Sequence, residues 1–139
     1  MSKFYICKIC GNLVEKVEDG GLAPMCCGKK MTILNSEEAT GSSDRHLPII
    51  TTHEITCPPN SAVKFTIVNV KVSSDLHPSL NNHYIKWIQL ETNHGAYRHY
   101  FKHEEIPNTN FIIGKDEIIR AAYAYCNIHG LWMNTKKST

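Results

Sequence analysis

The sequence predicts an all-β protein in two parts, a small cysteine-rich domain followed by an antiparallel β-sandwich. Two cysteine pairs, each followed by a glycine, gather near the start of the chain. The rest consists of short β-branched or alternating stretches that are separated by turn signals about every ten residues. No long stretch with helical periodicity interrupts them. We therefore predict a cysteine-rich domain over residues 1–36 and a β-sandwich over residues 37–139.

Length and composition indicate a globular protein and argue against several other classes. The chain has 139 residues, of which 42% are hydrophobic and 20% are charged, and its formal net charge is +2. No run of Lys or Arg exceeds two residues, which argues against nucleic-acid binding. The apolar runs are far shorter than the ~20 residues of a membrane span. The start lacks the apolar core of a signal peptide, so we expect a cytoplasmic protein whose six cysteines favour metal sites over disulfides.

The cysteine-rich domain contains four candidate sulfur ligands. Cys7 and Cys10 are three residues apart, whereas Cys26 and Cys27 are adjacent. Four thiolates make a tetrahedral site for iron or zinc. So short a segment cannot fold on apolar burial alone, and the metal should therefore form its core. The spacing leaves the metal open, although adjacent cysteines are unusual in zinc ribbons.

The expected strands follow from local composition and turn signals. They lie at residues 4–6, 13–17, 49–56, 62–72, 84–92, 97–102, 109–113 and 117–126. In the fourth of these, alternation places Val63, Phe65 and Ile67 on one apolar face. In the fifth, Ile85 and Trp87 are expected on one face. Residues 35–43 are polar and small, which indicates a linker between the two domains.

A second set of candidate ligands centres on a turn near the end of the chain. Cys126 and His129, followed by a glycine, can bind one metal from a single tight turn. Three upstream histidines, His46, His77 and His83, each lie beside turn residues. Neither an extended chain nor a helix would bring His77 and His83 together, so we expect a loop there. One thiolate and four imidazoles are too many ligands for a closed tetrahedral zinc site and suit iron.

The remaining candidates are interpreted as ordinary structural residues. Cys57 is left over after the other cysteines find partners, and we expect a packed thiol before two prolines. The two tryptophans are expected in the core or in the wall of the site. Four histidines lack a cysteine or turn partner and are assigned no ligand role: His53, His94, His99 and His103.

Together these motifs resemble desulfoferrodoxin, the two-iron form of superoxide reductase, over essentially the whole chain. The resemblance is carried by residues 4–12, 26–28, 46–48, 77–85 and 122–132. It implies an iron–tetracysteine domain like desulforedoxin, an immunoglobulin-like catalytic domain and, by similarity, a homodimer. It also implies a second, ferrous ion with an open sixth position and Cys126 as its axial ligand. The equatorial ligands would be His46, His77, His83 and His129.

The resemblance further implies an activity. Superoxide would accept one electron at the open position, and two protons would release hydrogen peroxide without returning dioxygen. An outside donor such as a rubredoxin would then reduce the iron again. The residues alone leave two alternatives, a non-enzymatic one-electron carrier and a zinc-stabilised binding module. The set of five ligands argues against both, because a structural site does not need five ligands with one position left open.

The chain departs from the family pattern directly before His46. The family usually has Glu-Lys there, whereas this sequence has Asp44-Arg45. In the family the Glu can occupy the sixth position of the oxidised iron, and the Lys attracts superoxide and helps protonation. Asp44 is one methylene shorter, and Arg45 keeps the positive charge but is a poor proton donor with a pKa above about 12. We expect Asp44 and Arg45 to act at the catalytic site with a changed pH dependence.

Overall fold

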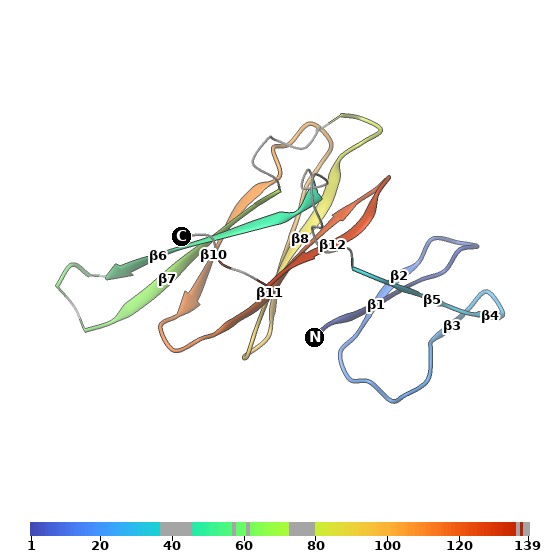
Figure 1. Ribbon diagram of the computed structural model, residues 1–139, viewed down its shortest axis with the longest axis horizontal. Coiled ribbons are helices and arrows are strands. Elements are labelled where there is room, and N and C mark those ends of the chain that lie inside the picture. Colours follow the sequence, from blue (N-terminus) through green and yellow to red (C-terminus); the bar gives the residue numbers. More distant parts are fainter. Residues whose placement is uncertain (37–45, 57, 61, 73–79, 136, 138–139) are drawn as a thin grey trace. The chain divides into compact units, whose positions relative to one another are not determined.

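The computed structural model describes residues 1–36, 46–56, 58–60, 62–72, 80–135 and 137. The regular structure of these residues consists of β-strands, and the chain divides into two compact units, Met1–Asn35 and Ser36–Thr139 (Figure 1). Within the described ranges, no helix is long and apolar enough to cross a membrane. The predicted all-β class, with a cysteine-rich N-terminal part and a β-sandwich, is confirmed.

The N-terminal unit consists of a small antiparallel sheet and a hairpin. In the sheet, β1 (Lys3–Ile6) lies between β2 (Leu13–Lys16) and β5 (Thr32–Leu34). The hairpin is formed by β3 (Met25–Cys26) and β4 (Lys29–Lys30). Strands β3, β4 and β5 were not predicted, because two or three residues are too few to show a period. The buried centre of the unit is correspondingly small and consists of Tyr5, Cys7 and Met31.

The β3–β4 hairpin turns at Cys27 and Gly28. Both residues have positive φ, 51° for Cys27 and 74° for Gly28. Two consecutive left-handed residues between paired strands make a type I′ turn, whose twist matches that of the flanking strands. Cys26 therefore lies on a strand and Cys27 lies in the turn that follows it.

Asp19 holds the loop that leads to this hairpin. Its carboxylate accepts hydrogen bonds from Nζ of Lys3 at 2.5 Å, from Nζ of Lys16 at 2.8 Å and from the amide of Gly21 at 2.9 Å. The bonds from the two lysines and the Gly21 amide, that from Lys16 foremost, hold the pKa of Asp19 well below its ordinary value. The ammonium of Lys16 also donates to the carbonyl of Leu22. This network fixes the chain between β2 and the second cysteine pair.

The C-terminal unit is a sandwich of two antiparallel sheets. One sheet has the strand order β10-β7-β6, and the other has the order β12-β11-β8-β9. Three strands packed against four is the arrangement of immunoglobulin-like sandwiches. The strands are β6 (Pro48–Thr56), β7 (Lys64–Val72), β8 (Ile85–Thr92), β9 (Ala96–Tyr100), β10 (Asn108–Gly114), β11 (Ile119–Cys126) and β12 (Gly130–Asn134) (Figure 1). Strand β12 was not predicted and forms a hairpin with β11.

The core of the sandwich is formed by side chains from the inner faces of both sheets. The sheet that contains β7 contributes Ile50, Val68, Val70, Val72, Phe111 and Ile113. The other half of the core comes from Ile85, Ile88, Leu90, Phe101, Ala122, Ala124 and Cys126. A cysteine that was predicted as a metal ligand is thus also a member of the hydrophobic core.

The predicted apolar face of β7 is not the face that enters the core. The buried side chains of this strand are Val68, Val70 and Val72, whereas Phe65 and Ile67 point to the opposite face and are only half-buried. Apolar residues occur on both faces of this strand. Period-2 alternation therefore cannot decide which face is inside without knowledge of the opposing sheet.

The prediction that Ile85 and Trp87 share a face is also wrong. In the pairing of β11 with β8, Tyr125 opposes Trp87, but Cys126 opposes Ile85, which leaves Lys86 as an extra residue. Such a β-bulge changes which face the following side chains occupy. Ile85 therefore enters the core, while Trp87 stacks on Tyr125 with the ring centroids 5.5 Å apart.

The neighbouring isoleucines of β10 provide a test of the sandwich. Ile113 is 2% exposed and Ile112 is 61% exposed. We expect Ile113→Ala to lower the free energy of unfolding of the C-terminal unit by about 2–5 kcal/mol, because the truncation leaves a cavity. Ile112→Ala should change it by less than about 0.5 kcal/mol. Chemical denaturation of the two variants measures the difference, and equal losses would contradict the assignment of faces.

The hairpin turn gives a second prediction. At Gly28, whose φ is 74°, a Cβ would meet no neighbouring atom within 4 Å, so only the backbone conformation opposes a substitution. Gly28→Ala should therefore destabilise the N-terminal unit by about 1–2 kcal/mol. Gly20→Ala, where the glycine has no positive φ and equally open surroundings, is the matched control. Hydrogen exchange of the amides in residues 1–35 measures the stability of the N-terminal unit in each variant. The prediction fails if the two variants lose the same stability.

Candidate metal centres

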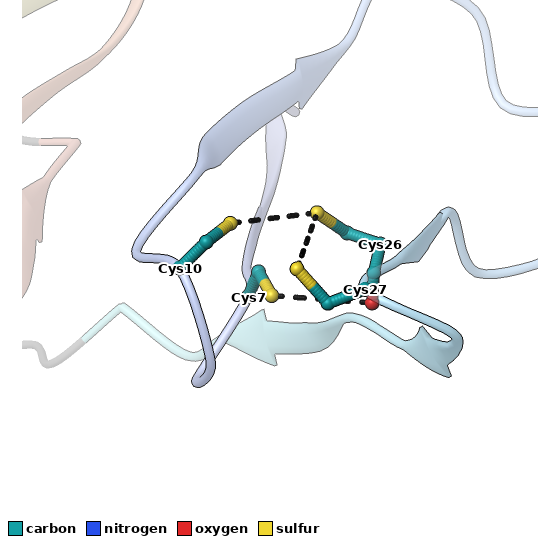
Figure 2. Close-up of side chains that lie close together, drawn as sticks. All are labelled: Cys7, Cys10, Cys26 and Cys27. Atoms are coloured by element: carbon teal, nitrogen blue, oxygen red, sulfur yellow. Dashed lines mark hydrogen bonds between the residues drawn. The ribbon is translucent and has the colours of Figure 1, made fainter.

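Four cysteine side chains of the N-terminal unit converge on one point. Cys7 and Cys10 come from the loop after β1, and Cys26 and Cys27 come from the β3–β4 hairpin; their sulfur atoms all lie within 4.8 Å of one another (Figure 2). The Sγ of Cys26 lies 3.6 Å from that of Cys10 and 3.9 Å from that of Cys27. Tetrahedral ligands with metal–sulfur bonds of ~2.3 Å are about 3.8 Å apart. The cluster therefore has the dimensions of a four-thiolate metal site.

Local turns bring each pair of cysteines into place. The amide of Gly11 donates to the carbonyl of Cys7 at 2.8 Å, and the amide of Cys7 donates to the carbonyl of Asn12, also at 2.8 Å. These bonds close the first loop around its two sulfur atoms. In the second pair, the type I′ turn reverses the chain at Cys27, so that two adjacent side chains serve the same site.

The electrostatics of the four thiols favour a bound cation. Hydrogen bonds from the backbone amides of Cys10 and Ile9 lower the pKa of the Cys7 thiol to about 6. Hydrogen bonds with the neighbouring thiols, that of Cys10 foremost, raise the pKa of Cys27 to about 12, and repulsion from a Cys10 thiolate adds a smaller part. The side-chain amide of Asn12 also donates to Sγ of Cys26, with an N–S distance of 3.6 Å. A metal cation removes the repulsion, so this donor set fits a metal ion.

A second cluster lies where β6 and β8 begin and β11 ends. His46 precedes β6, His83 precedes β8, Cys126 ends β11, and His129 lies in the turn before β12. One ligand atom from each residue lies within 4.8 Å of those of the other three. Nε2 of His83 and Nδ1 of His129 are 3.1 Å apart, and Sγ of Cys126 lies 3.8 Å from the same Nδ1 atom. Four of the five predicted ligands of this site thus come together.

The turn between β11 and β12 carries two members of this cluster. Cys126 pairs with Gly130, so residues 127–129 form the loop. Gly130 has a φ of 81°, which is in the left-handed region that favours glycine. The indole Nε1 of Trp132 donates to the carbonyl of His129 at 3.2 Å, and the indole stacks on the ring of His46 with centroids 4.9 Å apart. Trp132 thus forms one wall of the cluster.

A tight turn presents His83. The amide of Leu80 donates to the carbonyl of His83 at 2.9 Å, and the amide of His83 donates back to the carbonyl of Leu80 at 3.4 Å. Asn81 and Asn82 lie inside this turn, in the segment before His83 for which a loop was predicted. The side chain of Asn127, in the loop after β11, is hydrogen-bonded to the backbone on both sides of His83. It therefore joins the turn at His83 to the loop that contains His129. Sequence analysis gave Asn127 no role, although its position between Cys126 and His129 was a signal.

Exposure within the second cluster runs from the protein core to the solvent. Cys126 is fully buried, His46 and His83 are half-buried, and His129 is exposed. A thiolate is costly in apolar surroundings unless a cation lies beside it. Imidazole and thiolate together are ligands that iron accepts. The two clusters are therefore consistent with two iron sites.

The other predicted site residues have different outcomes. His77, Asp44, Arg45 and Cys57 lie outside the described residues. The histidines without an assigned role are exposed and belong to neither of the two clusters found among the described residues: His53, His94, His99 and His103. Trp87 is buried beside Tyr125 rather than in the second cluster.

Comparison with known proteins agrees with both the fold and the clusters. The desulfoferrodoxin family profile matches residues 38–135, and the profile of the desulfoferrodoxin N-terminal domain matches residues 1–34. A desulfoferrodoxin homolog from Archaeoglobus fulgidus is 33% identical over 130 residues, which cover 94% of each chain. The desulfoferrodoxin of Syntrophotalea carbinolica is 35% identical over 130 residues, which cover 92% of this chain and 91% of that protein.

Solved structures show the same fold. The superoxide reductase of Treponema pallidum superposes with a TM-score of 0.75 at 24% identity, over 96% of this chain and 98% of that one. A superoxide reductase (neelaredoxin) variant from Ignicoccus hospitalis superposes with a TM-score of 0.51 at 27% identity, over 66% of this chain and 77% of that one. Together with the profile matches and the two clusters, these similarities show that the chain belongs to the desulfoferrodoxin family.

Proposed function

We propose that this protein is a superoxide reductase that reduces superoxide to hydrogen peroxide by one electron at a non-haem iron centre. The observation that carries the proposal is the second cluster, in which a thiol at 0% exposure and three imidazoles converge at the edge of the hydrophobic core. A zinc-stabilised module does not require such a set, because structural zinc sites are closed and tetrahedral. Membership of the desulfoferrodoxin family and the superoxide reductase activity named for its structural relatives support the same reading.

We assign the two metal sites to the two parts of the chain. Residues 1–36 form an iron–tetracysteine domain, with Cys7, Cys10, Cys26 and Cys27 as ligands. Residues 37–139 form the catalytic domain. Its iron is held by Cys126 and by four histidines, namely His46, His77, His83 and His129. Within each of the two sets, the ligand atoms of the described members lie within 4.8 Å of one another, which supports the assignment.

The chemistry follows from the charges around the second cluster. Iron bound there supplies one electron per turnover by changing between its ferrous and ferric states. The buried thiolate of Cys126 places negative charge on the inner side of the site, whereas the exposed side carries His129. The guanidinium of Arg45 attracts the superoxide anion, and Asp44 stands where the family has a carboxylate that closes the oxidised site. Arg45 retains its own proton, so its guanidinium does not supply the two protons of hydrogen peroxide.

The wider setting is part of the same proposal. An external one-electron donor, such as a rubredoxin-like protein, restores the reduced state after each turnover. The active form is a homodimer and works in the cytoplasm. Membership of the desulfoferrodoxin family supports these assignments. A non-enzymatic electron carrier remains the competing function, since it would use the same two clusters.

The first test combines metal analysis with a reaction. We expect two irons per chain, in line with the two clusters. Adding superoxide to the reduced protein should give stoichiometric peroxide and a new thiolate-to-iron charge-transfer band. Cys126→Ser should abolish this band and leave the spectrum of the tetracysteine centre unchanged. Oxidation without peroxide would indicate an electron carrier, and zinc in the second cluster would contradict the proposal.

The replacement of Lys by Arg gives a pH prediction. The pKa of Arg45 lies above about 12, so its charge persists at pH values at which a lysine loses its proton. The wild-type protein should therefore still attract superoxide electrostatically at high pH and keep its rate. The rate of Arg45→Lys should begin to fall as pH approaches about 10. Stopped-flow rates of superoxide reduction between pH 6 and about 11 measure the effect. Superimposable profiles for the two proteins would show that this residue does not act on the substrate.

A further inference from the structure

We propose that Asn127 is a positioning residue, which sets the position of His83 relative to Cys126 and His129 and thereby controls iron retention and electronic structure at the second centre. This inference rests on the proposed function only in that it concerns the same iron site. It does not require that the iron react with superoxide.

Three hydrogen bonds carry the proposal. The backbone amide of Asn127 donates to the carbonyl of Tyr84 at 3.2 Å. Its side-chain Oδ1 accepts from the amide of Tyr84 at 2.9 Å, and its Nδ2 donates to the carbonyl of Asn82 at 2.9 Å. The side chain of Asn127 thus holds the residue before His83 and the residue after it. An asparagine is suited to this task because its amide offers an acceptor and a donor at once.

The bonds matter because the cluster is assembled from separate segments. His83 precedes β8, whereas Cys126 ends β11 and His129 lies in the loop that follows β11. The ladder between these strands shifts by one residue at its end, between Tyr125 and Cys126. Regular strand pairing therefore does not by itself determine where His83 lies relative to Cys126. The side chain of Asn127 supplies that restraint, and the 3.1 Å distance between His83 Nε2 and His129 Nδ1 depends on it.

The position of Asn127 separates this role from packing. The residue is exposed, so truncating its side chain opens no cavity in the core. Outer residues that orient metal ligands typically change metal affinity by 10–100-fold when they are replaced. Asn127 orients through the backbone on both sides of His83 and needs no direct contact with the metal.

Asn93 provides a matched control on another loop of the same sandwich. Its amide donates to the carbonyl of Ile118 at 3.0 Å, and its Oδ1 accepts from the amide of Ile118 at 2.8 Å. This is the same reciprocal pair that Asn127 makes with Tyr84, and Asn93 is also exposed. Asn93 joins the end of β8 to the start of β11, and it adjoins no member of the two clusters found among the described residues. Asn93→Ala thus removes an equivalent tie without touching the second cluster.

The experiment uses the iron-loaded full chain in four forms: wild type, Asn127→Ala, Asn127→Asp and Asn93→Ala. The first measurement is the rate of ferrous iron transfer from the second centre to a chelator. The second is the charge-transfer band and the paramagnetic resonance spectrum of the oxidised centre. Hydrogen exchange of the core strands confirms that each variant is folded. It also reports the protection of the Tyr84 amide directly.

We expect Asn127→Ala to release iron about 10–100-fold faster than wild type, with a shifted band and a broadened resonance spectrum. Asn127→Asp keeps the acceptor for the Tyr84 amide but cannot donate to Asn82. Its rate of iron release should therefore lie between those of wild type and Asn127→Ala. Asn93→Ala should lower stability and leave iron release and both spectra at wild-type values. The proposal is overturned if Asn127→Ala releases iron at the rate of Asn93→Ala with an unchanged spectrum. Failure of the wild type to form peroxide would instead reject the proposed reaction, because iron release is measured without superoxide.

Discussion

The pairing of β8 with β11 is the constraint on which the second cluster depends. His83 lies just before the start of β8, and Cys126 is the last residue of β11. The pairing of the two strands has a bulge at this end. The bulge turns Ile85 and Cys126 together into the core. The alanines of β11 at positions 121, 122 and 124 are fully buried. Such small side chains let neighbouring elements pack closely around the strand that ends in the thiol.

The two clusters rely on different physical devices. In the N-terminal unit, ligand placement depends on backbone conformation, with left-handed residues at Gly11, Cys27 and Gly28 and few buried apolar side chains. A unit with so small a core gains much of its stability from the metal itself. In the C-terminal unit, the sandwich core includes Cys126 but is otherwise formed by apolar side chains that bind no metal. The metal there is added to a scaffold whose loops already hold the imidazoles close together.

The gradient of exposure across the second cluster connects its structure with its proposed chemistry. Cys126 is part of the hydrophobic core, while His129 faces solvent. A thiolate on the inner side is protected from water and from oxidants, which a low-pKa, exposed cysteine would not be. Under the proposed function, the superoxide anion and the protons it requires reach the site from the outer side, where His129 is exposed. The stacking of Trp132 on His46 closes part of the remaining perimeter with an apolar ring.

The amino-acid sequence by itself determined the kinds of ligands, their grouping into two sets and the approximate positions of the strands. These features are local, because cysteine and histidine chemistry, turn residues and period-2 alternation act within a few neighbouring positions. The need for a fold-back before His83 and for a flexible residue at Gly130 could be predicted for the same reason.

Only the tertiary structure decided which side of β7 is buried, that Lys86 bulges, that β12 exists as a strand and that Asn127 ties His83 to Cys126. Each of these depends on pairing between residues that are far apart in the chain. A strand with apolar residues on both faces carries no local sign of its inner face. The position of an asparagine beside two ligands can signal a role, but it does not show which backbone groups the side chain will hold. Which backbone Asn127 holds is decided only when β8 and β11 pair, and which face of β7 is buried is decided only when the two sheets pack together.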